Sequence, residues 1–399
     1  MESKTFCVLP FMHMATNASG VYRVCCNSTP GKNQILDEHG KAMHLAKDDI
    51  ETVWHSKFYQ DLRQQFIDGD RPEICQRCFS EEDAGVKSAR QSFNEAWHTD
   101  DIEIAPNPKN IDIRYVDLRL GNLCNLKCRM CNPYASSQWI KEWNQVVDTA
   151  ELVPNVKLSE DEISRLSNMD WFENSMVWDN IAKIADTIEE IYLTGGEPTL
   201  AVKQYDLFQY LHDKGLSQNI RLKYNTNLTN IPEQMTWHWH RFKLVKVNAS
   251  IDAVGELDRY VRYPSAWNKI EENFTKLRRL RNTRMQIHST VQTYNALNLH
   301  KMYEWCDSIN FDDVYLNILN HPRCLNIKTL PLKIKEQVAD NLKPYLNRQK
   351  VKQTIDYMMS EHWFDQYWPE FIAYTNELDR SRKENVLELI PEFSEYWYD

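Results

Sequence analysis

Six short apolar segments, separated by helical segments, constrain the fold of residues 111–325 more than any other feature of this 399-residue chain. The apolar segments lie near residues 114–120, 190–194, 220–224, 245–251, 285–292 and 313–318. Apolar residues with helical spacing lie near residues 134–147, 203–214, 231–241, 266–281 and 298–308. Strands that alternate with helices form parallel sheets. The sequence therefore predicts an α/β fold for this part of the chain.

Polar residues follow several of these strands at the point where each strand ends. The second strand runs into Gly195, Gly196 and Glu197, where we expect the glycines to let the backbone approach a ligand closely. The next two strands end near Asn225 and Asn227, and near Ser250. The carboxyl ends of strands in a parallel barrel share one face, and that face holds the active site. The sequence therefore predicts that these residues contribute to one site.

Three cysteines follow the first strand in a C-x3-C-x2-C spacing. They are Cys124, Cys128 and Cys131. Thiolates hold iron–sulfur clusters, and three of them leave one iron of a [4Fe–4S] cube without a protein ligand. An open iron can bind a substrate or cofactor. The alternative is a structural zinc site, but zinc prefers four ligands, commonly in C-x2-C pairs, and the C-x3-C step fits that pattern poorly.

The three-cysteine loop, the Gly-Gly-Glu-Pro turn and the later polar strand ends together resemble the radical S-adenosylmethionine (SAM) superfamily. The resemblance covers roughly residues 112–320 and implies a partial (β/α)6 barrel similar to a TIM barrel. It implies that the three cysteines hold a [4Fe–4S] cluster whose open iron binds SAM. Cleavage of SAM would give methionine and a 5′-deoxyadenosyl radical, which removes a hydrogen atom from the substrate. The cofactor carries this chemistry, and the protein orients the reactants.

The same resemblance implies roles for single residues at the SAM site. Gly195, Gly196 and Glu197 would contact the methionyl amino group, and Asn225, Asn227 and Ser250 the ribose. Arg262 is the better candidate for the methionyl carboxylate, with Arg259 as the second candidate and a solvated helix face as the alternative for both. The family usually has an aromatic residue near the adenine at position 130, where this chain has Met130.

Five cysteines precede the barrel. The segments around 11–16 and 21–25 read as two strands joined by a turn at Gly20, which brings Cys7 and Cys25 toward the same end. Residues 56–68 read as a helix with an apolar face, and Cys75 and Cys78 form a C-x2-C pair after it.

This arrangement resembles the twitch module, a shortened SPASM domain that holds an auxiliary [4Fe–4S] cluster with four cysteines. The resemblance implies Cys7, Cys25, Cys75 and Cys78 as its ligands, and Cys26 is an alternative to Cys25. The module usually follows the barrel, whereas here it precedes it. Zinc is the alternative metal, since four cysteines ending in C-x2-C also suit it.

The predicted organisation has three parts. Residues 1–98 form the cysteine module, residues 111–325 the partial barrel, and residues 326–399 a helical carboxy-terminal cap, for which substrate recognition is an alternative role. Residues 99–110 read as a linker. The segment 148–180 carries Trp171, Phe172 and Trp178, which we expect to shape the substrate entrance.

Three further residues could carry chemistry. We expect His13 to be a structural histidine and Cys306 to be a small buried residue. Cys324 lies just past a strand end and could face the substrate.

Charge and the amino terminus limit the partners and the compartment. The net charge of −10 argues against nucleic acid, whose partners normally carry a basic surface. The chain has no secretory signal and no apolar span of membrane length, so we expect a cytoplasmic protein with reduced thiols.

The sequence leaves three functions open. The first is oxidative modification of a peptide or protein, with the auxiliary cluster assisting and a flavodoxin or ferredoxin as the external electron donor. The second is dehydrogenation of a small molecule. The third is a non-enzymatic electron-transfer protein, against which the SAM-type residues argue.

Overall fold

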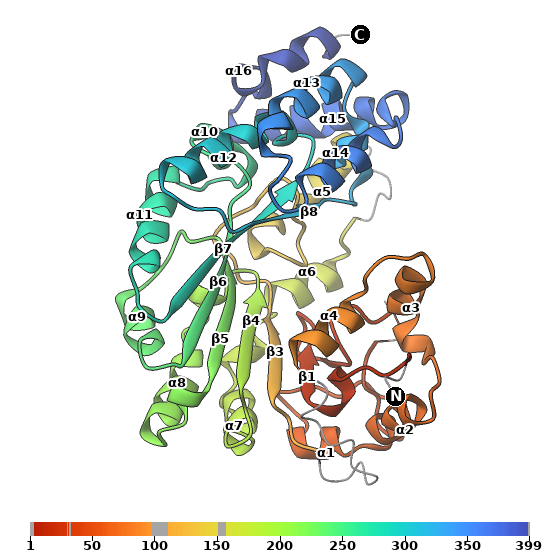
Figure 1. Ribbon diagram of the computed structural model, residues 1–399, viewed down its shortest axis with the longest axis vertical. Coiled ribbons are helices and arrows are strands. Elements are labelled where there is room, and N and C mark those ends of the chain that lie inside the picture. Colours follow the sequence, from red (N-terminus) through yellow and green to blue (C-terminus); the bar gives the residue numbers. More distant parts are fainter. Residues whose placement is uncertain (1–3, 30, 32, 98–110, 151–156, 398–399) are drawn as a thin grey trace. The chain divides into compact units, whose positions relative to one another are not determined.

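The computed structural model describes residues 4–29, 31, 33–97, 111–150 and 157–397 (Figure 1). The predicted linker at residues 99–110 lies outside the described residues. Contacts divide the chain into two units. The first unit comprises residues 1–123, 169–224 and 232–245, and the second comprises residues 124–168, 225–231 and 246–399. The three-part division expected from the sequence stays a prediction.

Eight strands among the described residues form one sheet in the order β2-β1-β3-β4-β5-β6-β7-β8. They are β1 (His13–Thr16), β2 (Tyr22–Arg23), β3 (Tyr115–Leu120), β4 (Glu190–Gly195), β5 (Arg221–Thr226), β6 (Leu244–Ser250), β7 (Thr283–Val291) and β8 (Val314–Ile318). The order is linear, as in a partial barrel. The six strands from β3 to β8 are the six expected from the sequence, which confirms the predicted fold class.

Helices of the first unit fall into two groups. The amino-terminal group is α1 (Ile50–Trp54), α2 (Lys57–Ile67), α3 (Gln76–Asp83) and α4 (Ala89–Ala96), and the second group is α7 (Ser175–Lys183), α8 (Gln204–Asp213) and α9 (Glu233–Trp239). Helix α2 buries Tyr59, Leu62 and Phe66, the apolar face expected for the 56–68 segment.

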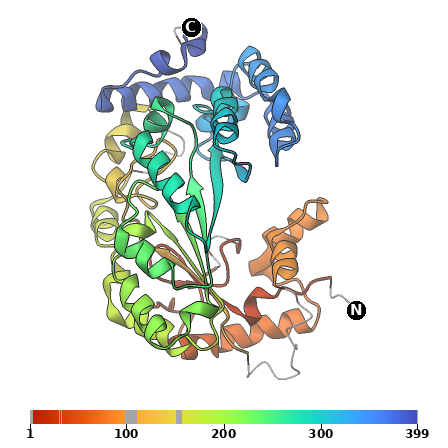
Figure 2. The ribbon, with the colours of Figure 1, turned by 60° about the vertical axis from the view of Figure 1, so that its left-hand side comes forward.

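The second unit contains the remaining helices. They are α5 (Trp143–Ala150), α6 (Glu160–Ser167), α10 (Glu256–Val261), α11 (Trp267–Arg278), α12 (Leu299–Ser308), α13 (Leu332–Leu342), α14 (Val351–Met359), α15 (Phe364–Arg382) and α16 (Val386–Leu389). Helices α13–α16, in blue, gather at one end of this unit in both views (Figures 1 and 2). The helix expected over 134–147 is shorter. A 3-10 turn, η4 (Ser137–Trp139), precedes α5, and the Ser136 hydroxyl both caps that turn and donates to the Leu126 carbonyl.

The amino-terminal hairpin joins the edge of the sheet in the first unit. Strand β1 pairs antiparallel with β2 and parallel with β3, with His13 beside Tyr115 and Ala15 beside Asp117. Strand β3 continues in parallel with β4, and β4 with β5. The cysteine module therefore shares backbone hydrogen bonds with the first barrel strand.

One face of this sheet is apolar and carries helices. Val116, Ile191 and Leu222 are neighbours in the register of β3, β4 and β5, and all three are fully buried. Tyr224, on the same face, packs its ring 4.9 Å from that of Trp239 in α9 and donates to Gln204 in α8. Burial of these side chains under α8 and α9 holds the first unit together.

The opposite face of the same sheet is polar. Asp117 lies beside Tyr192, and Tyr192 lies beside Lys223. The Lys223 ammonium sits 4.6 Å from the centroid of the Tyr192 ring. Residues in one row of a sheet project to the same side, so these three side chains form a continuous polar row.

The aromatic residues of the 148–180 segment do not shape an entrance, contrary to our expectation. Trp171, Phe172 and Trp178 are buried in the first unit. The Trp171 indole donates to the Ala18 carbonyl at 2.8 Å, and the Trp178 indole to the Phe172 carbonyl at 2.8 Å. A large aromatic ring is stable in a protein interior when its N–H group has a backbone acceptor. Both tryptophans meet this condition, which explains why they are buried.

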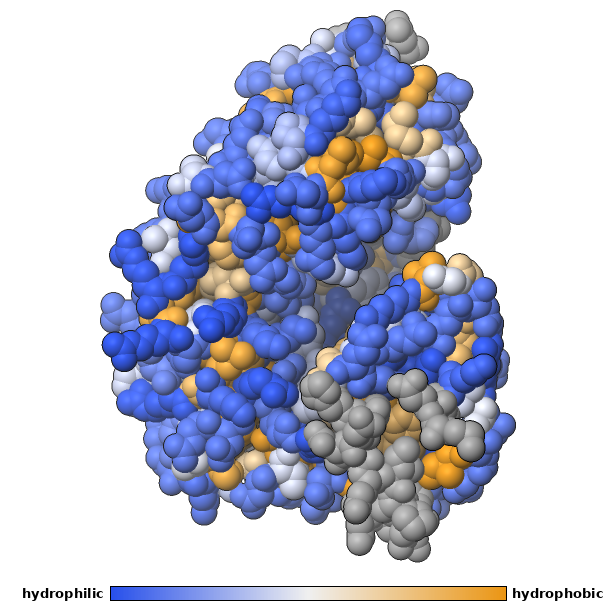
Figure 3. Space-filling model, in the orientation of Figure 1, coloured by the Kyte–Doolittle hydropathy of each residue, from blue (hydrophilic) through white to orange (hydrophobic). Residues whose placement is uncertain are grey.

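The surface view shows a mostly hydrophilic face with apolar side chains in small separate groups (Figure 3). Within the described ranges, no helix is both long enough and apolar enough to cross a bilayer.

Candidate functional site

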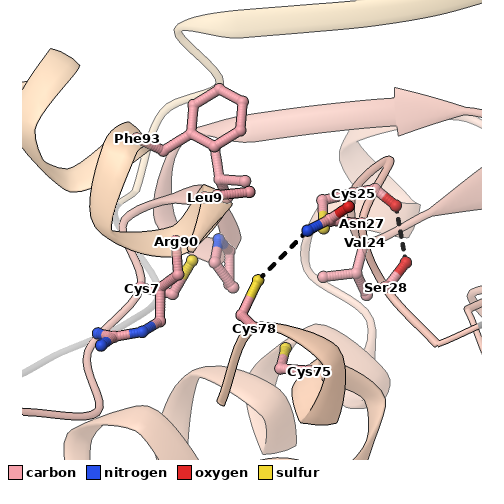
Figure 4. A pocket seen from close by; sticks show the side chains of 12 residues that line it. Cys7, Leu9, Val24, Cys25, Asn27, Ser28, Cys75, Cys78, Arg90 and Phe93 are labelled. Carbon is pink, nitrogen blue, oxygen red and sulfur yellow. Dashed lines mark hydrogen bonds between the residues drawn. The ribbon is translucent and has the colours of Figure 1, made fainter. Parts of the chain in front are cut away.

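The four cysteines predicted for the auxiliary cluster line one cavity in the first unit (Figure 4). Cys7 precedes the 3-10 turn η1 (Leu9–Phe11), and Cys25 follows β2. Cys75 ends the turn η2 (Glu73–Cys75), and Cys78 lies in the first turn of α3. The cavity encloses about 420 Å³ of empty space, part of it open to solvent. The sulfur atoms of the four cysteines point into this cavity (Figure 4).

Helix α4 fastens the segment that carries Cys7. The Asn94 side chain accepts from the Val8 N–H and donates to the Phe6 carbonyl, both at 2.9 Å. The Arg90 guanidinium donates to the same carbonyl at 2.5 Å and also lines the cavity. Sequence analysis missed α4, although its start carries a visible signal. Ser88 and Gln91 form a capping box, a pattern that marks helix starts.

Polar groups and burial set the electrostatics of this cavity. The Asn27 amide donates to the Cys78 sulfur at 3.7 Å. Burial and neighbouring cysteine thiols raise the pKa of Cys25 to about 12 and that of Cys75 to about 12. The pKa of Cys7 is also raised, mainly by burial.

Cys26 differs from Cys25 in its surroundings. Cys25 is buried and lines the cavity, whereas Cys26 is exposed and is absent from the lining residues. The geometry therefore favours Cys25 as the ligand, although the choice between them stays a prediction.

The three cysteines of the other motif lie in the second unit. Cys124 and Cys128 are buried together with Leu126, and Met130 and Cys131 pack against them. The thiols of Cys128 and Cys131 share a hydrogen bond, which lowers the pKa of Cys128 and raises that of Cys131. The Cys124 sulfur accepts from the Leu126 N–H at 3.4 Å. Chain folding thus brings the three sulfurs into one small buried group.

Asn227 lies against this cysteine loop. Its amide donates to the Asn125 side chain at 3.0 Å and lies 4.0 Å from the Cys124 sulfur. Asn225 instead accepts from the Asn248 amide at 2.7 Å and is half-buried, as is Ser250 at the end of β6. The structure therefore brings Asn227 to the cysteines and leaves Asn225 and Ser250 at their strand ends.

Arg262 forms a buried ion pair that the sequence did not predict. Its Nε lies 2.8 Å from the Asp252 carboxylate, two residues beyond β6. Burial alone would lower the pKa of Arg262, but Asp252 and Cys128 nearby raise it. Arg259 is more exposed and pairs with Glu256 and Glu384, at 2.9 Å each.

Asp252 and its neighbour Asp258 were not singled out in the sequence. Asp252 also accepts the Thr290 N–H at 2.6 Å, and Asp258 accepts the Ser265 hydroxyl at 3.0 Å. Burial raises the pKa of both carboxyls, that of Asp258 to about 7. The signal in the sequence was Asp252, an acidic residue directly after the strand expected over residues 245–251.

The Gly195-Gly196-Glu197 turn lies in the first unit, at the end of β4. The Glu197 N–H donates to the Leu123 carbonyl at 2.7 Å. A Cβ at Gly196 would lie 2.3 Å from that carbonyl oxygen, and a Cβ at Gly195 2.5 Å from the Leu120 oxygen. The glycines therefore let β4 and the chain after β3 approach each other, where we had expected an approach to a ligand.

The Glu197 carboxylate also has a local role. One oxygen accepts the Thr199 N–H at 3.2 Å and the Thr199 hydroxyl at 2.7 Å, so Glu197 caps the 3-10 turn η6 (Pro198–Leu200).

The remaining candidates are buried. His13 lies between Tyr115, the Val24 carbonyl at 3.3 Å and Asp117 at 3.8 Å, which agrees with a structural histidine. Cys306 is buried in α12, as expected. Cys324 is fully buried in the turn η9 (Arg323–Leu325), where burial and the Glu370 carboxylate raise its pKa.

Two family comparisons match the two parts of the chain that carry the cysteine sets. Residues 118–305 match the radical SAM superfamily, and residues 7–79 match SPASM, an iron–sulfur cluster-binding domain. The chain contains a radical SAM domain. Its SPASM domain precedes the radical SAM domain, as the sequence indicated. No curated protein matches the chain.

Several solved structures are similar in part. Native anSMEcpe with bound AdoMet is 19% identical, with 60% of each chain covered and a TM-score of 0.38. AnSMEcpe with bound AdoMet and Cp18Cys peptide is 17% identical, with 55% of this chain and 56% of that chain covered and a TM-score of 0.36. SuiB from Streptococcus suis is 12% identical, with 77% and 65% covered and a TM-score of 0.36. The chain thus spans little more than half the length of the anSMEcpe chains it matches.

The two domains imply the cofactors. A radical SAM domain uses a [4Fe–4S] cluster and SAM, and a SPASM domain binds auxiliary iron–sulfur. Among the described residues, no three His, Cys, Asp or Glu side chains lie close enough together to hold a single metal ion. Four sulfurs around a cavity, and three sulfurs in a buried group, are donor sets that fit thiolate-bound clusters.

The radical SAM domain should tolerate no side chain at Gly196. We expect Gly196→Ala to lower the free energy of unfolding by about 2 kcal/mol or more, because the new Cβ meets backbone that cannot rotate away. Gly215→Ala is the control, since only its positive φ opposes a side chain there, and it should cost about 1 kcal/mol. Denaturant unfolding compares the two. Equal losses would contradict a steric role for Gly196.

The number of clusters can be counted directly. Anaerobic reconstitution should give about eight irons per chain, at four irons per cluster. Replacing Cys124, Cys128 and Cys131 by Ala should leave about four, held by the SPASM cysteines. Metal analysis that instead finds about four irons with stoichiometric zinc in the wild type would make the auxiliary site a zinc site.

Proposed function

We propose that this radical SAM protein cleaves SAM reductively and oxidatively modifies a peptide or protein substrate, with the auxiliary cluster assisting. A core cluster held by Cys124, Cys128 and Cys131 would supply the electron for cleavage of SAM into methionine and a radical that can take a hydrogen atom from the substrate. A cluster held by the four amino-terminal cysteines would accept the second electron, and loss of a proton to solvent would complete a two-electron oxidation of the substrate. The observation that carries the proposal is the presence of two separate cysteine sets, one of three and one of four, each brought together by folding.

In this proposal Cys124, Cys128 and Cys131 hold the core cluster and leave one iron for SAM. Glu197 accepts a hydrogen bond from the methionyl ammonium, next to Gly195 and Gly196. Support comes from its burial, because a charged hydrogen bond is stronger where water is excluded.

Arg262 is the proposed partner of the methionyl carboxylate. A guanidinium has five N–H donors in a fixed fork, so contact with Asp252 through Nε leaves donors for a second carboxylate. The ion pair also restricts the side chain to one orientation. This supports Arg262 over Arg259, whose two carboxylate partners hold it at a more exposed position.

The remaining SAM contacts are proposed for polar strand ends and one apolar residue. Asn225, Asn227 and Ser250 would bind the ribose hydroxyls, and Met130 would pack near the adenine. Asn227 has the strongest support, because it already contacts the cysteine loop through Asn125. Met130 packs against the buried cysteines, and its flexible thioether can adapt to a ring.

In the auxiliary site Cys7, Cys25, Cys75 and Cys78 would hold the second cluster. An external flavodoxin or ferredoxin would supply the electron for the core cluster. The polar row of Asp117, Tyr192 and Lys223 supports a substrate with many hydrogen-bonding groups, of which a peptide is one. A small molecule is the alternative substrate, and the products separate the two.

SAM cleavage should depend on the core cysteines alone. With dithionite and SAM, the wild type should release 5′-deoxyadenosine, and Cys128→Ala should release none, because the open-iron site is lost. Cys75→Ala should keep cleaving SAM while forming no oxidised product. Chromatography of the nucleoside measures all three. A wild type that binds iron yet never cleaves SAM would favour the electron-transfer alternative.

Glu197→Gln tests the proposed ammonium contact. The amide keeps the shape and removes the charge, so SAM affinity should fall about tenfold or more, as expected for a hydrogen bond between charged groups. Iron content should not change, since Glu197 is not a cluster ligand.

The matched control for Glu197 is Thr199→Val. It removes the hydroxyl that donates to Glu197 while leaving the carboxylate in place. This variant should lose thermal stability and keep its SAM affinity. If Glu197→Gln behaves in the same way, then Glu197 only caps η6 and the turn is not the methionine site.

A further inference from the structure

Arg129 lies between the cluster cysteines Cys128 and Cys131, and its side chain is fully buried in the second unit. Its guanidinium donates to the Asp379 carboxylate at 2.5 Å and to the Glu384 carboxylate at 2.9 Å. A third donor reaches the Tyr260 carbonyl at 3.0 Å. The guanidinium carbon also lies 3.5 Å from the centroid of the Tyr260 ring. The cysteine loop is therefore tied through one side chain to the carboxy-terminal region.

The two carboxylates that bind Arg129 are themselves held in place. Asp379 lies in the last turn of α15, and it also accepts the Tyr260 hydroxyl and, on its other oxygen, the Val386 N–H, at 2.8 Å each. Glu384 follows α15 and is shared with Arg259. These contacts hold the Asp379 and Glu384 carboxylates in place independently of the cysteine loop. The guanidinium of Arg129 therefore has one preferred position.

The backbone of the same loop is held as well. The Tyr374 hydroxyl, from α15, donates to the Arg129 carbonyl at 2.6 Å, and the Arg129 N–H donates to the Val261 carbonyl at 2.8 Å. The Trp139 indole donates to the Cys128 carbonyl at 3.0 Å. Hydrogen bonds to other segments of the chain therefore restrain Cys128 and Arg129. Two of the residues that make such bonds, Tyr374 and Asp379, lie in α15.

Energetics argue against a simple packing role for this network. Apolar side chains of the same volume stabilise an interior at least as well as a buried ion pair, which must first lose its hydration. What the ions add is direction, since one guanidinium nitrogen of Arg129 donates to both carboxylates and the planar group donates only along fixed directions. A network with this cost, placed between two ligand cysteines, suits the positioning of those cysteines.

We propose that α15 is a positioning element of the radical SAM site, acting through Asp379, Glu384 and Tyr374 on Arg129. The carboxy-terminal helices were expected to cap the barrel, with substrate recognition as the alternative role. In this account they hold the three-cysteine loop in the shape that accepts the core cluster and presents its open iron to SAM. The role in cluster and SAM binding rests on the proposed function. The effect of α15 on the geometry of the loop can be tested without cofactors.

Asp379→Asn is the central variant, and Glu377→Gln is its matched control. Both exchange a buried carboxylate on α15 for an amide, but the carboxylate of Glu377 accepts its hydrogen bonds from Gln145 and Arg380, which lie outside residues 124–131. Amide hydrogen exchange is measured on peptides covering residues 124–131 in the metal-free protein. We expect Asp379→Asn to speed exchange there about tenfold or more and Glu377→Gln to leave it unchanged.

Three further substitutions separate positioning from loss of fold. Tyr374→Phe removes one hydrogen bond and should speed exchange in the same peptides by a smaller factor. Arg129→Lys keeps the charge and should disturb the loop less than Arg129→Met. If Asp379→Asn does not fold, these variants decide the matter by the same readout.

In the reconstituted enzyme, the positioning account predicts that Asp379→Asn lowers the rate of 5′-deoxyadenosine release at saturating SAM, at a melting temperature no lower than that of Glu377→Gln. Unchanged exchange over residues 124–131 in Asp379→Asn, Tyr374→Phe and Arg129→Met would overturn the inference. A wild type that cleaves no SAM would refute the proposed function instead, and it would leave the exchange result standing.

Discussion

The position of the Gly195-Gly196-Glu197 turn depends on one contact. At this contact the end of β4 and the chain after β3 bring their backbones close together. Only glycine fits at positions 195 and 196, because a Cβ there would overlap the backbone of Leu120 and Leu123. The Glu197 N–H then closes the contact on the Leu123 carbonyl. Leu123 is the residue before Cys124, so this packing sets where the cluster loop begins.

Burial makes the thiolate form costly for the cysteines of the auxiliary cavity. It raises the pKa of Cys25 and that of Cys75 to about 12, so without metal these thiols keep their protons at neutral pH. Cluster ligands are thiolates, so assembly must release those protons, and the free energy of cluster binding has to cover that cost. Hydrogen bonds to sulfur, such as that from Asn27 to Cys78, help to stabilise the charged form.

Much of this fold could be predicted from local patterns, because the strands and most helices of the barrel follow apolar periodicity. The cysteine spacing likewise separated the cysteines into the two sets that folding brings together. Most of the missed features depend on contacts between residues that are distant in the sequence. Examples are the pairing of β1 with β3 and the link of Arg129 to Asp379, two residues 250 positions apart. Trp171 and Trp178 show the same limit, since only the folded chain shows which carbonyls accept their indole N–H groups.

The account's central claim is that one cluster has an iron open to SAM and the other does not. Electron paramagnetic resonance of the dithionite-reduced protein tests it most directly, with spectra recorded before and after SAM is added. The account predicts that SAM shifts the g values of the cluster that is lost in Cys128→Ala and leaves the signal lost in Cys75→Ala unchanged. Spectra that SAM does not alter, in a protein carrying both clusters, would contradict it.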